Sequence, residues 1–107
     1  MPKYLFEATY TAEGLHGLFK DTASGRKAAI QKTIKGLGGK LETFYYSFGD
    51  NDVILVVDLP DNITAATVAM AVGSSGLVHG RTTPLLTVEE VDKAIKMKSK
   101  YRAPGSE

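Results

Sequence analysis

The pattern of apolar and polar residues predicts four strands in this chain. Apolar and polar side chains alternate with a period of two over the aromatic-rich N-terminal stretch, as they do in a strand with two different faces. Later apolar and β-branched runs are bounded by turn residues. The expected strands are Lys3–Thr11, Lys40–Phe48, Asp52–Leu59 and Leu77–Leu86.

Three helices are expected between and after these strands. An apolar stripe with helical spacing runs over Ala29–Leu37 and stops at Gly38, with a short helical piece before it around Leu15–Phe19. A second helix, Thr64–Val72, is rich in alanine and uncharged, so most of its circumference is expected to be buried. Thr87 and Glu90 have the spacing of a capping box and begin a C-terminal helix.

The run Val53–Val57 consists of five consecutive apolar residues. A strand with this sequence has no water-facing side and must be covered on both faces. The chain has 107 residues, enough to lay helices over one face of a small sheet. We therefore expect a second copy of the chain to cover the other face.

The order of elements is β-α-β-β-α-β with an added helix, the arrangement of ferredoxin-like α+β domains. The first and third strands then lie in the middle of an antiparallel sheet, with both crossover helices on one face. Pro84 removes a backbone donor from the fourth strand, which favours an edge position. We expect one domain over residues 1–101 and a flexible tail over residues 102–107.

The amino-acid composition narrows the classes of molecule that the protein is expected to bind. Thirteen basic and twelve acidic residues give a net charge of +1, so no global field favours nucleic acid or an anionic membrane. Cysteine is absent, which excludes disulfides and thiolate metal sites and fits a reducing compartment. The N-terminus lacks the apolar core of a signal peptide. A cytoplasmic protein is the resulting expectation.

Two residues in the strands are candidates for ligand binding. Glu7 lies in a central strand, where a carboxylate must pair, accept hydrogen bonds or change its pKa. A salt bridge or subunit contact with Arg81 or a lysine is the favoured explanation. Tyr45 and Tyr46 point to opposite faces, so one of the two phenols faces a subunit interface or cavity.

The two histidines give little support for a metal site. His16 and His79 are far apart in sequence and have no partner at ligand spacing, so no metal or other cofactor is expected. His16 is expected on a polar loop or helix start, either solvated or lining a pocket as an acid or base. Asp50, Asn51 and Asp52 lack the glycine and distal glutamate of a calcium loop and are explained as turn formers.

The segment LGGKLETFYYSFGDNDVILVVDLPD, the alanine-rich helix and SSGLVHGRTTPLLTVEEVDKA resemble the GYD-domain family over roughly Pro2–Ile95. This family is similar to the dimeric α/β-barrel superfamily, so the resemblance implies a ferredoxin-like fold and packing of two sheets in a dimer. Asn51 stands where the family has a tyrosine. The resemblance implies no activity.

The leading hypothesis is a homo-oligomer, a dimer or a higher even assembly, that binds a small molecule at the sheet–subunit interface. Glu7, His16, Tyr45 and Arg81 are its expected ligand-binding residues. One alternative is a cofactor-independent monooxygenase or isomerase, by analogy with other dimeric barrels. Another is a purely structural or interaction module.

Overall fold

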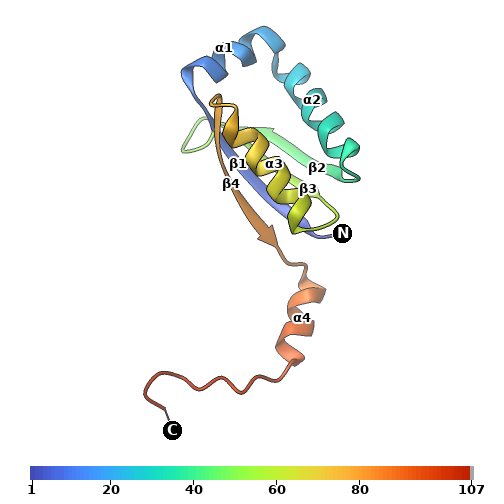
Figure 1. Cartoon of the computed structure of the whole chain (residues 1–107), viewed down its shortest axis with the longest axis vertical. Helices are drawn as coiled ribbons and strands as arrows, with labels where there is room; N and C mark the ends of the chain where they lie inside the picture. Colours follow the sequence, from blue (N-terminus) through green and yellow to red (C-terminus); the bar gives the residue numbers. More distant parts are fainter. Residues whose placement is uncertain (107) are drawn as a thin grey trace.

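The computed structural model describes residues 1–106 and contains four strands and four helices (Figure 1). The strands are β1 (Lys3–Tyr10), β2 (Lys40–Tyr46), β3 (Val53–Asp58) and β4 (Val78–Leu85). The helices are α1 (Ala12–Asp21), α2 (Ala23–Gly36), α3 (Asn62–Ser74) and α4 (Val88–Lys96).

The sheet has the strand order β2-β3-β1-β4, and all neighbouring strands are antiparallel. β1 and β3 occupy the centre and β4 an edge, as the apolar run in β3 and Pro84 in β4 predict. With α2 and α3 on one face, this is the expected ferredoxin-like α+β arrangement.

The segment between β1 and β2 differs from the prediction, because two full helices replace one helix and a short preceding piece. The Thr11 side chain accepts from the Gly14 amide at 3.1 Å and begins α1. The Thr22 side chain accepts from the Gly25 amide at 3.1 Å and begins α2 directly after α1 ends. These caps start both helices before the apolar positions on which the prediction rested.

The β2–β3 hairpin has a shorter first strand than predicted. β2 ends at Tyr46, and Phe48 lies in the turn with its side chain fully exposed. The Ser47 amide donates to the Asp52 carbonyl at 2.8 Å and closes the turn. The Asp52 carboxylate accepts from the Tyr10 amide at 2.8 Å, which ties the turn to the end of β1. The expected role of Asp52 as a turn former is confirmed by these bonds.

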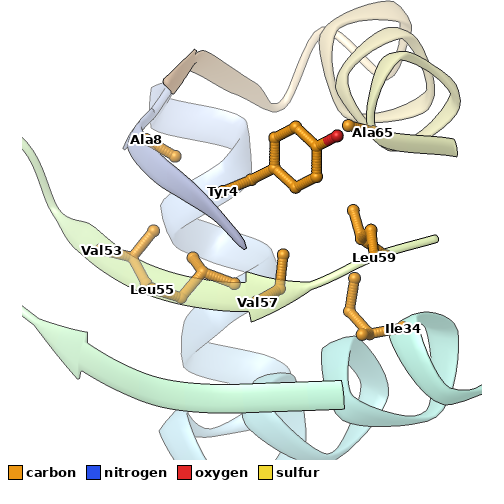
Figure 2. Close-up of a cluster of buried hydrophobic side chains, with 8 residues drawn as sticks. All are labelled: Tyr4, Ala8, Ile34, Val53, Leu55, Val57, Leu59 and Ala65. Carbon is orange, nitrogen blue, oxygen red and sulfur yellow. The ribbon is translucent and has the colours of Figure 1, made fainter. Parts of the chain in front are cut away.

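The core lies between the sheet and α2 and α3 (Figure 2). Alternate residues of the central strands point into it, because side chains in a strand alternate between faces. The Tyr4 hydroxyl donates to the Asn62 side chain at 2.6 Å, so its buried phenol has a partner. The buried hydrophobic residues of this core are Tyr4, Ala8, Ile34, Val53, Leu55, Val57, Leu59 and Ala65.

Helix α3 is much more exposed than its uncharged sequence predicts. Ala65 is its one buried residue, while Ile63 and Met70 are 78% and 68% exposed. The prediction that most of the helix is buried is therefore wrong for the single chain. The reason is tertiary, since α3 packs on the β4 side of the sheet and α2 lies too far away to cover it (Figure 1).

Helix α4 extends away from the rest of the domain (Figure 1). It begins with the predicted capping box, in which Thr87 and Glu90 exchange hydrogen bonds of 2.9 and 3.1 Å. All of its residues are exposed, and the molecule measures 60 Å along its longest axis. The flexible tail expected over residues 102–107 stays a prediction, and its last residue, Glu107, lies outside the described part of the chain.

Candidate functional site: a cleft between the helices and the sheet

A cleft of about 850 Å³ lies between α1, α2, α3 and the sheet, and we call it the helix cleft. Phe6, Phe44 and Leu55 form part of its floor. Ile30 of α2 and Val68 of α3 contribute to opposite walls. The cleft exists because α2 packs over β2 and α3 over β4, which leaves the helix face of β1 and β3 between them.

The lining of the helix cleft is largely apolar. Most of its side chains are aliphatic or aromatic, and several of them are only partly buried although they pack against the core. Ligand pockets in proteins are typically 300–1,000 Å³, apolar, and supplied with a few polar groups. The helix cleft has the size and chemistry of such a pocket.

Polar groups gather at the end of the helix cleft near α1. Arg26 and Asp21 both line the cleft, with 3.7 Å between guanidinium and carboxylate. The Tyr46 hydroxyl donates to the Ala23 carbonyl at 2.9 Å close by. Burial raises the pKa of Tyr46, and the neighbouring Tyr10 raises it further. The Arg26 guanidinium and the Tyr10 side chain therefore line the cleft, and Tyr46 is fixed beside it by its hydrogen bond to Ala23.

The other face of the sheet is not covered by any helix of the described residues, and we call it the open face. Its central apolar side chains, Leu5, Ile54 and Val56, are half-buried. The five apolar residues of β3 thus divide as predicted, with Val53, Leu55 and Val57 toward the helices and the other two toward the open face.

Three of the four predicted site residues lie in one line across the open face. Tyr45 of β2 pairs with Ile54 of β3, and Ile54 pairs with Glu7 of β1. On its other side, Glu7 pairs with Arg81 of β4. Neighbouring strands are about 4.8 Å apart, so this cross-strand row brings together residues distant in sequence. Tyr45 and Tyr46 point to opposite faces, as expected, and Tyr45 is 69% exposed.

The described residues of the single chain do not form the predicted salt bridge of Glu7 with Arg81 or a lysine, and the alternative of a subunit contact stays a prediction. Among the described residues, no ion pair joins the two side chains although they are directly opposite. The Glu7 carboxylate instead accepts from the Asn51 side-chain amide at 3.2 Å. Asn51 reaches Glu7 from the β2–β3 turn, a contact between positions 44 residues apart that sequence reasoning missed.

The fourth predicted site residue, His16, is separated from the cross-strand row. It lies within α1, on the helix side of the sheet, with its side chain exposed. Its ring is 6.5 Å from that of Phe19, a contact within the same helix. His79 lies on the exposed edge strand β4, opposite Thr9. The structure therefore does not assemble the two histidines with Glu7.

An ion-pair network occupies one end of the open face. The Lys3 ammonium donates to Glu42 at 2.7 Å and to Asp58 at 2.8 Å. These hydrogen bonds, Asp58 first, raise the pKa of Lys3 above its ordinary value. The network joins the ends of β1, β2 and β3, so the charges of Lys3, Glu42 and Asp58 have a structural role.

The described part of the chain contains neither a cluster of metal-binding side chains nor a helix suited to cross a membrane. Residues 1–106 hold no group of three or more histidine, cysteine, aspartate or glutamate side chains placed to bind a metal ion. No helix within this range combines the length and apolar character needed to cross a membrane.

The β-α-β-β-α-β order, the antiparallel sheet and the single helix layer define a ferredoxin-like α+β domain. The GYD domain model matches residues 4–95, most of the chain, and the protein belongs to the GYD-domain family. Comparison with curated proteins and with solved structures finds no match in either.

Proposed function

We propose that this protein is an oligomeric domain that binds a small, mainly apolar molecule in the helix cleft. The observation that carries the proposal is the cleft itself, a largely apolar hollow of about 850 Å³ that Arg26 and Tyr10 also line. Leaving so much apolar surface in contact with water is unfavourable, and a bound apolar molecule would remove it from water.

The proposal is tested with an apolar fluorescent probe and two tryptophan variants of the same helix. Val68 lines the cleft, so Val68→Trp places a large ring in it, whereas Ile63→Trp changes a side chain of α3 that is 78% exposed. We expect saturable binding of anilinonaphthalene sulfonate to the unchanged protein. We expect at least about tenfold weaker binding for Val68→Trp and unchanged binding for Ile63→Trp, a difference of about 1.4 kcal/mol.

Circular dichroism and thermal unfolding serve as controls, because the same probe also binds loosely packed states. The proposal fails if the natural protein shows no saturable binding or if the two variants bind alike. Native mass spectrometry of the freshly purified protein complements this test, since a retained apolar molecule would add its mass to that of the assembly.

A second candidate site is the cross-strand row on the open face, where the sequence analysis predicts a ligand between two subunits. The observation that favours it is the half-buried Glu7 carboxylate, which has an amide partner but no ion-pair partner among residues 1–106. A ligand or second subunit with a cationic or donor group would complete its hydrogen bonding. If Glu7→Gln changes neither the assembly mass nor ligand retention, this second site is excluded.

A further inference from the structure

Helix α4 has an apolar stripe without a partner. Val88, Val91 and Ile95 are spaced at three and four residues, so they lie on one face of the helix. They are 76%, 41% and 73% exposed. A nine-residue helix is too short to be stable in isolation and normally gains its stability by packing an amphipathic face.

The helix cleft is a second apolar surface without a cover. Its mouth lies between α2 and α3, and side chains from both helices are only partly buried there, among them Ile30 and Val68. The described residues therefore leave two apolar surfaces without cover, the convex stripe of α4 and the concave helix cleft.

Helix α4 cannot readily cover the cleft of its own chain. Only Leu86 and Thr87 separate it from β4, and two residues span at most about 7 Å. α3 packs on β4 and stands between that strand and the mouth of the cleft. α4 leaves at the end of the sheet opposite α1 and extends away from α1, α2 and α3 (Figure 1).

The charges of the two surfaces are complementary. α2, which forms one lip of the cleft, carries Arg26, Lys27, Lys32 and Lys35 and no acidic residue. α4 carries Glu89, Glu90 and Asp92 in its first half, and Lys93 and Lys96 in its last turn. α3, the other lip, is uncharged over its whole length. An acidic helix start is therefore favoured beside the α2 lip.

We propose that α4 of a second copy of this chain packs its apolar stripe over the mouth of the helix cleft and closes the binding site. Two chains that exchange α4 reciprocally form a closed dimer. One part of this inference rests on the proposed function, namely the small molecule held in the cleft beneath α4. The contact between the two chains does not require that molecule.

Cross-linking between differently tagged full-length chains tests the contact, because the natural sequence contains no cysteine. Ile95→Cys on the α4 stripe is mixed with Ala71→Cys, an exposed residue of the cleft wall, and treated with a short bismaleimide. Lys93→Cys, on the opposite side of α4, replaces Ile95→Cys in the matched control. We expect a product carrying both tags, at least fivefold more abundant with Ile95→Cys than with Lys93→Cys.

Three outcomes would overturn the inference. Equal yields from the two α4 positions would show that the stripe is not seated in the cleft. Preferential cross-linking of Ile95→Cys to Tyr45→Cys would assign α4 to the open face instead. A chain carrying both Ile95→Cys and Ala71→Cys that links only within itself would show that α4 folds back. Because no ligand is added, these outcomes are independent of probe binding to the cleft.

Discussion

Gly14 is a position where the close approach of α1 to the backbone of Leu77, just before β4, leaves no room for a side chain. It is buried, its amide donates to Thr11, and a Cβ placed on it would collide with the carbonyl oxygen of Leu77. That carbonyl also accepts from the Thr11 amide at 2.9 Å. Gly17, one turn later in the same helix, has open space around its missing Cβ.

Gly14→Ala and Gly17→Ala should therefore have opposite effects on stability. We expect Gly14→Ala to lower the free energy of unfolding by about 1–3 kcal/mol, because backbone atoms must move to admit the methyl group. Gly17→Ala should raise it by roughly 0.5–1 kcal/mol, because alanine loses less backbone entropy in a helix than glycine. Urea unfolding of both variants measures the difference, and a stabilised Gly14→Ala would contradict the described packing of α1.

The caps show how far local sequence determines the elements. Thr87 and Glu90 predict the start of α4, and the structure confirms both hydrogen bonds. Thr11 and Thr22 carry equivalent caps, but the sequence analysis predicted only a helix from the stripe Ala29–Leu37 and a short piece around Leu15–Phe19, so it missed both helix starts. Thr22 has φ of 70°, a left-handed backbone that sequence pattern does not indicate for a β-branched residue.

The capping box makes the start of α4 sensitive to pH. The backbone hydrogen bond from Thr87 lowers the pKa of Glu90 below its ordinary value. The ionised Glu90 carboxylate therefore contributes its full stabilisation of α4 above the ordinary glutamate pKa. This contribution is lost as the pH falls through the lowered pKa of Glu90. The Thr87 amide resonance in NMR should follow this titration. Glu90→Gln should abolish this titration of the Thr87 resonance, and the control Glu89→Gln should leave it unchanged. A Thr87 resonance that does not change between pH 7 and pH 3 in the natural protein would exclude the capping bond.

At the scale of the whole molecule, the uncovered apolar surfaces favour an oligomer. The open face carries Leu5, Ile54 and Val56, and burying each such side chain contributes about 1.5–3 kcal/mol before the costs of association. The exposed stripe of α4 adds apolar surface at the end of the molecule.

Charge placed on the open face should weaken the assembly without unfolding the chain. We expect an even-numbered oligomer of the 11.5 kDa chain, and Val56→Lys should lower the assembly mass measured by light scattering. Gln31→Lys, which adds the same charge on an exposed residue of α2, should leave that mass unchanged. An unchanged mass for Val56→Lys would mean that the copies meet through other surfaces.

The sequence by itself determined the order of elements, the fold class and the central place of β3, because periodicity, caps and apolar runs act over a few neighbouring residues. It also placed Tyr45 and Tyr46 on opposite faces. Only the tertiary structure decided that Tyr45, Glu7 and Arg81 form one row, that Asn51 binds Glu7, and that His16 lies elsewhere. The helix cleft likewise depends on the distance between α2 and α3. That distance is set by packing among segments far apart in sequence, which no local pattern records.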